Sequence, residues 1–310
     1  MRFLFGAGAV FFCSVTSFPV QFTNTVIPPI KKIISYKIVK YYVKNFPSII
    51  VTREIKKHGV NTFYYFIDRD SLSYGITDEW GSDDFTKDDD GNVHQFNTLQ
   101  RLQLFRHEPF GNGAEKFSPE NQVKIVLTSD LCPTSRPFAR NFYECLTKFS
   151  RRTGRPVPIV IFFSGRWIEN HPLNLEEIKK YPINFIAGNH TYDHPIISGG
   201  YLKELLISEV TNTERIMIEN GILPSYLFRF PGLMHTASDI DCINSINIIA
   251  LDANVWMGEH FKNWNVLLVH SNGNAETEVN AFTNFLEKPG KITFTDAFKF
   301  LELSLISTNN

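Results

Sequence analysis

Short apolar runs alternate with segments of helical periodicity from about residue 122 to the end of the chain. Short apolar runs bounded by turn residues are typical of buried strands, whereas apolar residues spaced three and four positions apart indicate amphipathic helices. The segment 202–220 has the clearest helical pattern, and Gly221 directly after it is suited to end the helix. Strands that alternate with helices predict a parallel sheet or barrel. We expect strands at 123–128, 157–163, 184–187, 227–230, 248–251 and 266–269, and further helices at 138–153 and 175–180.

The first third of the chain, residues 25–118, has a different pattern. The aromatic run at 62–67 is β-prone and predicts a strand. The acidic stretch that ends at 88–92 is typical of a tight hairpin turn, and a calcium loop is the alternative, although its oxygen ligands do not fall at alternate positions. Turn-forming residues at 111–119 predict a linker. We therefore expect an N-terminal extension of mixed or β-rich character, followed by a second domain at 120–305.

Residues 1–20 have the pattern of a secretory signal peptide: Arg2 is followed by an apolar run at 3–15 and then by small polar residues. The apolar run is shorter than the roughly 20 residues that span a bilayer, so a signal peptide is favoured over a retained anchor. We expect an exported, soluble product without a stable membrane span, periplasmic or extracellular. In an oxidising compartment, Cys132 and Cys145 are a candidate disulfide pair.

Composition excludes one class of partner. The 310-residue chain carries a net charge of -1 at neutral pH, so it lacks the cationic field that a nucleic-acid-binding protein uses to neutralise phosphates. The 28 phenylalanines indicate either a large aromatic core or a carbohydrate-facing cleft, and composition does not separate the two. No pattern in the chain indicates its oligomeric state.

Polar residues follow the predicted strands at their C-terminal ends, which is where the catalytic residues of parallel barrels lie. His190 and His194 come after the strand at 184–187. Residues four apart lie on one face of a helical turn, so we expect the two imidazoles to converge. Neutral imidazole is a common ligand of Zn²⁺ and related ions, whereas two surface or capping histidines are the structural alternative. The other polar or aromatic residues at successive strand ends are Asp130, Arg229, Asp252, Trp256 and His270.

Five short motifs, taken in order, carry a resemblance to a known family. They are Thr128-Ser-Asp130-Leu131-Cys132-Pro133, His190-Thr-Tyr-Asp-His194-Pro195, Arg229-Phe-Pro231-Gly232, Asp252-Ala-Asn-Val255-Trp256 and Leu268-Val-His270. In this order and spacing the chain resembles the polysaccharide deacetylase family with the NodB homology domain, carbohydrate esterase family 4. The second motif matches the family pattern in full, and the other four match in part.

The resemblance implies an α/β fold, a distorted (β/α) barrel of the NodB type. It implies a metal-dependent hydrolase that removes N-acetyl groups from an N-acetylated polysaccharide, such as peptidoglycan, a chitin-like polymer or a surface glycan. The implied cofactor is a divalent metal, with Zn²⁺ as the first candidate and Co²⁺ or a similar ion as the alternative.

The resemblance also implies a role for each motif residue. His190 and His194 would hold the metal, Asp130 would be the general base, and His270 would protonate the leaving amine. The remaining residues would support them: Arg229 would steady the base, Asp252 would orient Arg229, the main-chain N–H of Gly232 would complete an oxyanion hole, and Trp256 and Leu268 would line the acetyl pocket.

Two carboxylates of the family pattern are missing. Leu131 stands where the family has a metal-binding aspartate, and Val255 stands where it has an aspartate that tunes the catalytic acid. One alternative is that Asp130 itself is a metal ligand. A second is that a carboxylate such as Asp193 or Asp239 completes the site, and a third is that the site is degenerate. The third alternative predicts a catalytically silent glycan-binding protein on the same fold.

Overall fold

The computed structural model describes residues 25–59, 62–87, 110, 123–262, 264–287 and 292–307. The predicted signal peptide, the predicted hairpin turn or calcium loop at 88–92, the predicted linker and the predicted domain boundary near 118–120 all lie outside the described residues. The chain divides into two compact units. One contains the residues up to Leu104 together with Met217–Leu223, and the other contains the remainder.

The N-terminal unit is built on an antiparallel sheet, in which the described residues form five strands in the order β4-β3-β2-β1-β5. Apolar residues of these strands, among them Val51 and Phe66, form a small core, against which Trp80 and Phe85 pack. The predicted strand at 62–67 is confirmed. The elements are β1 (Ile33–Val43), β2 (Phe46–Lys57), β3 (Thr62–Asp68), β4 (Tyr74–Thr77), the short helix η1 (Ser82–Asp84) and β5 (Phe85–Thr86).

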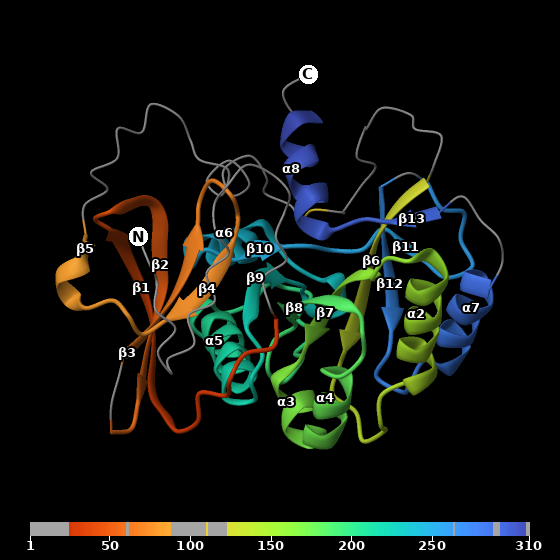
Figure 1. The fold of residues 1–310 in the computed structure, drawn as a ribbon, viewed down its shortest axis with the longest axis horizontal. Helices are drawn as coiled ribbons and strands as arrows, with labels where there is room; N and C mark the ends of the chain where they lie inside the picture. Colours follow the sequence, from red (N-terminus) through yellow and green to blue (C-terminus); the bar gives the residue numbers. More distant parts are fainter. Residues whose placement is uncertain are drawn as a thin grey trace. The chain divides into compact units, whose positions relative to one another are not determined.

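The second unit is an α/β structure around a parallel sheet (Figure 1). Among the described residues its strands run in the order β10-β9-β8-β7-β6-β12-β11, and β13 also pairs with β6. The predicted alternation of strands and helices is confirmed. The elements are β6 (Val123–Leu131), α2 (Arg140–Thr153), β7 (Pro158–Phe163), α3 (Gly165–Asn170), α4 (Pro172–Ile178), β8 (Asn184–Asn189), α5 (Lys203–Glu219), β9 (Pro224–Phe228), η2 (Pro231–Leu233), α6 (Ala237–Ser245), β10 (Ile249–Ala250), β11 (Val255–Trp256), β12 (Asn265–His270), α7 (Glu276–Glu287), β13 (Ile292–Phe294) and α8 (Ala297–Ser307).

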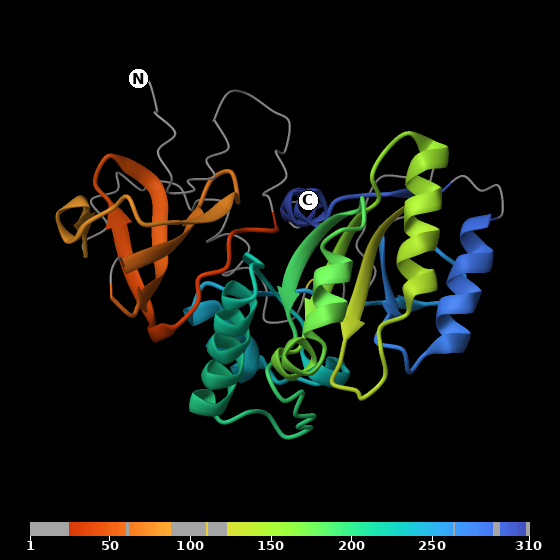
Figure 2. The ribbon, with the colours of Figure 1, turned by 60° about the horizontal axis from the view of Figure 1, so that its bottom comes forward.

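Strand β6 is covered on both faces, since every residue from Ile125 to Leu131 is buried. A parallel strand buried in this way consists largely of apolar residues, which is why its position could be read from the sequence. Helices α2 and α7 lie side by side next to this part of the sheet (Figures 1 and 2). Phe142 of α2 and Phe282 of α7 meet there, with ring centroids 5.1 Å apart.

Two strands differ from the predicted ones in ways that affect the candidate site. Strand β6 continues to Leu131, three residues past its predicted end, so Asp130 lies inside the strand. Strand β9 begins earlier than predicted and ends at Phe228, so Arg229 follows the strand instead of lying in it.

The helices follow local sequence signals. Helix α4 begins at Pro172, earlier than predicted, because proline suits the first turn of a helix, where its missing N–H is not needed. Helix α5 matches the prediction to within one residue at each end. Gly221 has a φ of 73°, the left-handed conformation expected of the residue that ends it. Across the described part of the chain, no helix has the length and apolar character needed to cross a bilayer.

Candidate active site

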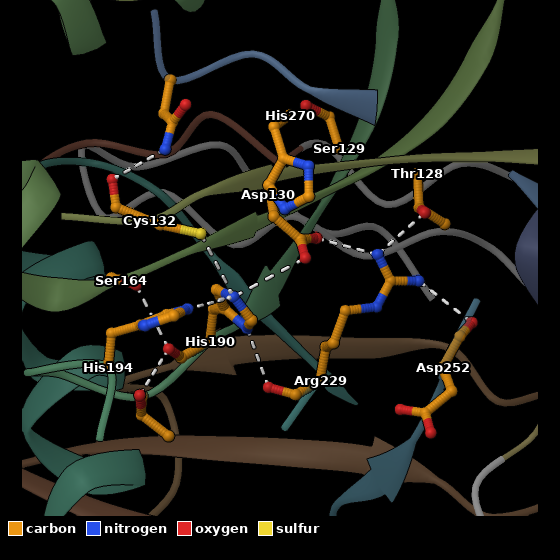
Figure 3. Close-up of polar contacts among 12 residues, drawn as sticks. Thr128, Ser129, Asp130, Cys132, Ser164, His190, His194, Arg229, Asp252 and His270 are labelled. Atoms are coloured by element: carbon orange, nitrogen blue, oxygen red, sulfur yellow. Dashed lines mark hydrogen bonds and ion pairs between the residues drawn. The ribbon is translucent and has the colours of Figure 1, made fainter. Parts of the chain in front are cut away.

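The parallel sheet brings residues from distant parts of the sequence to one edge. His270, the last residue of β12, is in register with Asp130 of β6. On the other side of β6, the neighbouring strand β7 is in register with β8, which ends at Asn189 directly before His190. Figure 3 shows the resulting group, with Asp130, His190 and Arg229 pointing toward one another. The prediction that these strand ends meet is confirmed.

His190 and His194 converge, but the predicted helical turn between them is wrong. The chain leaves β8 as a loop in which Thr191 has a φ of 62° and His194 a φ of 60°. Both lie in the left-handed region, and they turn the chain so that the two Nε2 atoms lie 3.1 Å apart. The loop is held by Glu209 of α5, whose Oε2 accepts hydrogen bonds from the N–H groups of Tyr192 and Asp193 at 2.8 Å.

The contacts of His190 fix which of its ring nitrogens carries a proton. Its Nδ1 lies 2.9 Å from the main-chain oxygen of Arg229, and a carbonyl can only accept, so Nδ1 donates. Burial lowers the pKa of His190 to about 4, so the ring is neutral near pH 7 and Nε2 carries a lone pair. Burial also lowers the pKa of His194. Two uncharged imidazoles therefore face one another.

Arg229 is fully buried, and its guanidinium is satisfied by four acceptors. It donates to Asp130 Oδ1 and to Thr128 Oγ1, both at 2.8 Å, and its other bonds go to the carbonyl oxygens of Leu251 and Asp252, both at 3.0 Å. Its position is therefore fixed from two directions, by strand β6 and by the segment that follows β10.

Asp130 is buried and ionised. Burial alone would raise the pKa of its carboxyl, but the positive charge of Arg229, with a smaller effect of His190 and His270, more than offsets this and lowers the pKa. Arg229 binds Oδ1, while Oδ2 lies 3.6 Å from Nε2 of His190. Asp130 thus offers one fixed oxygen to Arg229 and one oxygen to the imidazoles.

His270 is paired with a carboxylate that sequence reasoning missed. Its Nδ1 lies 3.1 Å from Oε2 of Glu278, in the first turn of α7. Burial would lower the pKa of His270, but the hydrogen bond and the charge of Glu278, together with Asp130, raise it overall. Val255, where the family pattern has an aspartate, is a buried residue of β11. Glu278 lies outside every motif, so no sequence signal could have identified it.

Asp252 contacts Arg229 through its main-chain carbonyl and not through its carboxylate. The carboxylate is buried, and Oδ1 has no hydrogen-bond partner among the described residues. Burial raises the pKa of Asp252 to about 7. Its Oδ2 lies 3.9 Å from Nδ1 of His235, close to the outer limit of an ion pair.

The three remaining motif residues lie near the same strand ends. Trp256 and Leu268 are neighbours in the register of β11 and β12, and Trp256 is 39% exposed whereas Leu268 is buried. Gly232 has a φ of 63°, a conformation that glycine adopts without strain. The role of Gly232 in an oxyanion hole and the roles of Trp256 and Leu268 in an acetyl pocket stay predictions.

The two acidic residues considered as replacement ligands are engaged elsewhere. Asp193 forms an exposed ion pair with Arg166. Asp239 caps α6, where its Oδ2 accepts a hydrogen bond from the main-chain N–H of Thr236 at 2.8 Å, and its Oδ1 accepts another from the N–H of Tyr201. Neither carboxylate is part of the cluster of possible metal ligands around His190.

Cys132 belongs to that cluster. Its Sγ lies 3.6 Å from Nε2 of His190, and the ligand atoms of Cys132, His190 and His194 all lie within 4.8 Å of one another. The predicted disulfide between Cys132 and Cys145 is wrong, because both are free thiols and Cys145 is buried in α2. Strand periodicity could have found this contact, since residues two apart in a strand share a face, which places Cys132 with Asp130.

Comparison with known proteins finds one matching family model and several similar folds. The family model described as polysaccharide deacetylase matches residues 118–248, a segment that contains Asp130, both histidines and Arg229. The fold is similar to that of PdaA from Bacillus subtilis, a family 4 carbohydrate esterase, at 17% identity and a TM-score of 0.50, covering 64% of this chain and 86% of that one. The predicted NodB-type fold is confirmed.

Two further solved structures are similar. A family 4 carbohydrate esterase from Bacillus anthracis has 17% identity and a TM-score of 0.49, covering 65% of this chain and 90% of that one. A CE4 family pseudoenzyme from Bacillus anthracis has 16% identity and a TM-score of 0.44, covering 58% of this chain and 66% of that one. The family match covers residues 118–248 and includes the intact motif His190–Pro195, so this segment of the chain matches the polysaccharide deacetylase family.

Proposed function

We propose that this protein is a metal-dependent hydrolase that removes N-acetyl groups from an N-acetylated polysaccharide. The observation that carries the proposal is the convergence of two neutral imidazoles beside an ionised carboxylate held by a buried arginine. These are the groups that amide hydrolysis needs: ligands for a Lewis acid and a base placed next to them.

The imidazoles fit a divalent cation. The ring of His190 is held by a hydrogen bond from Nδ1 to a carbonyl, which is the usual way that proteins orient a histidine ligand. Its Nε2 then faces Nε2 of His194. His190 and His194 would hold the metal, which when bound would polarise the acetyl carbonyl and activate the attacking water.

Asp130 serves as the general base in this proposal. Its Oδ1 is fixed by Arg229, so Oδ2 is the atom that accepts the proton of the attacking water. Arg229 keeps the carboxylate ionised and oriented, and its bonds to two carbonyl oxygens hold the guanidinium in place. The alternative in which Asp130 is itself a metal ligand is less favoured, because its oxygens are not part of the cluster formed with His194.

His270 serves as the general acid. Glu278 accepts a hydrogen bond from Nδ1 and favours the protonated ring, so Nε2 carries the proton that the leaving amine requires. Because His270 is in register with Asp130, the acid and the base lie on adjacent strands. Glu278 thus supplies the carboxylate that Val255 removes from the family pattern, which favours an active enzyme over a degenerate site.

We further propose that the substrate lies outside the cytoplasm, as peptidoglycan, a chitin-like polymer or a surface glycan. The support is the signal-like pattern of residues 1–20 together with the family of the domain.

The test is acetate release by zinc-loaded protein from N-acetylglucosamine oligomers, chitin and peptidoglycan. We expect release from at least one of them, and we expect His190→Ala to abolish both stoichiometric metal and acetate. His260→Ala, at an exposed histidine of the same unit, is the control and should keep both. A wild-type protein that binds oligosaccharide and metal but releases no acetate would instead be the glycan-binding alternative.

A further inference from the structure

We propose that Cys132 is the third protein ligand of the metal site, so that a thiolate replaces the carboxylate that Leu131 removes. The inference rests on the metal-binding part of the proposed function. It makes the site a Cys-His₂ centre formed by Cys132, His190 and His194.

The distances from His190 to the other two ligands fit one small cation. With Zn–N near 2.0–2.1 Å and Zn–S near 2.3 Å, a tetrahedral site places two ring nitrogens about 3.3 Å apart and a ring nitrogen about 3.5 Å from the sulfur. The two Nε2 atoms lie 3.1 Å apart, and Sγ of Cys132 lies 3.6 Å from Nε2 of His190 (Figure 3). Two of the three pairs therefore already have the spacing of a zinc site, and the ligand atoms of the third pair, Cys132 and His194, lie within 4.8 Å of one another.

Ordinary hydrogen bonding accounts poorly for this arrangement. Because Nδ1 of His190 donates to the carbonyl of Arg229, Nε2 has a single lone pair. Nε2 of His194 and Sγ of Cys132 both lie against that one lone pair. One acceptor cannot serve two donors well, whereas three lone-pair-bearing atoms around one point are what a cation satisfies.

The local backbone explains why position 132 can replace position 131. Successive side chains of a strand point to opposite faces, so Leu131 is directed away from the face of Asp130 and is fully buried. The next residue returns to that face, and the contact between Cys132 and His190 shows this directly. The side-chain amide of Asn272 lies 3.5 Å from the carbonyl oxygen of Cys132, at the outer limit of a hydrogen bond.

A thiolate ligand changes which metal the site accepts. Sulfur ligands favour zinc and other soft or borderline ions, whereas Mg²⁺ and Mn²⁺ favour oxygen ligands. With two imidazoles and one thiolate, the site should select Zn²⁺ and Co²⁺ over Mg²⁺ and Mn²⁺. Three protein ligands also leave a fourth position open, as in catalytic zinc sites.

The test is a titration of metal-free, reduced protein with Co²⁺, followed by absorption spectroscopy. Wild-type protein should bind one Co²⁺ and show a sulfur-to-cobalt charge-transfer band in the near ultraviolet. Cys132→Ser should lose the band and bind at least about 100-fold more weakly, since even the loss of a group that supports a ligand weakens metal binding 10–100-fold. Cys242→Ser, at a buried thiol of α6, is the matched control and should keep both.

The outcomes separate this inference from the proposed function. One Co²⁺ bound by wild-type protein without the band, or with full affinity retained in Cys132→Ser, would overturn the thiolate ligand and leave the metal site standing. A wild-type protein that binds no Co²⁺ would overturn both. The wild-type band is read without any substitution, so the test remains decisive even if Cys132→Ser folds poorly.

Discussion

Removing either partner of the Asp130–Arg229 pair isolates a charge in the interior of the protein. Their side chains are 3% and 0% exposed, and Arg229 Nη1 lies 2.8 Å from Asp130 Oδ1. We consider the single variants Asp130→Asn and Arg229→Met and the double variant, all in metal-free protein so that metal binding does not contribute to stability.

The size of the effect follows from the burial. Breaking a buried ion pair by removing one partner destabilises a protein by about 3–5 kcal/mol. Arg229→Met also leaves two carbonyl oxygens, those of Leu251 and Asp252, without this donor, and each orphaned group adds about 1–3 kcal/mol. We therefore expect Asp130→Asn to destabilise the wild-type protein by about 3 kcal/mol but to stabilise Arg229→Met by roughly 1–3 kcal/mol, because there it removes an unpaired buried charge.

The assay is urea unfolding of the four proteins, with the coupling energy taken from the double-mutant cycle. The exposed bidentate pair of Arg140 and Glu177, with N–O distances of 2.7 and 2.8 Å, is the control and should give a coupling close to zero. Additive effects of the two substitutions at Asp130 and Arg229 would refute the assignment of Asp130 as an ionised carboxylate held by Arg229.

Three further predictions concern single residues. Glu278→Gln removes the partner that raises the pKa of His270, so the alkaline limb of the pH profile of kcat/KM should move to lower pH. The control is Glu276→Gln, at an exposed residue of the same helix turn, which should leave this limb in place. An unmoved alkaline limb in Glu278→Gln would contradict the role of Glu278. Burial raises the pKa of Asp252 from 3.8 to about 7 in the folded state, so the stability that this residue contributes is present below pH 4 and is lost as the pH rises to about 7, by up to about 4 kcal/mol. Asp252→Asn should remove this part of the pH dependence in unfolding experiments. An unchanged dependence would contradict the raised pKa of this buried carboxylate. Gly188→Ala would place a Cβ 2.4 Å from Cδ1 of the Phe162 ring, so it should lower the free energy of unfolding by about 1–3 kcal/mol. An unchanged free energy of unfolding would show that the Phe162 ring can move aside.

Local patterns predicted the features that depend on local physics. The apolar run Ile125–Leu127 marks the buried strand β6, and helix α5 is followed by Gly221 in the left-handed conformation. The parallel sheet then follows from the alternation of strands and helices, which is why Asp130 and His270 could be placed at one edge before the structure was known.

Contacts that depend on long-range packing could not be predicted. The loop that brings His190 to His194 is held by Glu209 of helix α5, and nothing within the motif itself indicates this contact. The pairing of His270 with Glu278 likewise depends on where α7 packs. Cys132 differs from these two cases, because a local signal was present. Its position two residues after Asp130 indicated the face on which His190 lies, whereas its residue type suggested a disulfide.

The most direct test of the central claim is the rate of acetate release per bound zinc, compared between wild-type protein and Asp130→Asn at equal zinc content. A general base contributes about 10²–10⁴-fold, so the variant should retain its zinc and lose at least about 100-fold in rate on an N-acetylated glycan that the wild type deacetylates. Full activity in Asp130→Asn, or no acetate from zinc-loaded wild-type protein on any N-acetylated glycan, would contradict the proposed hydrolase.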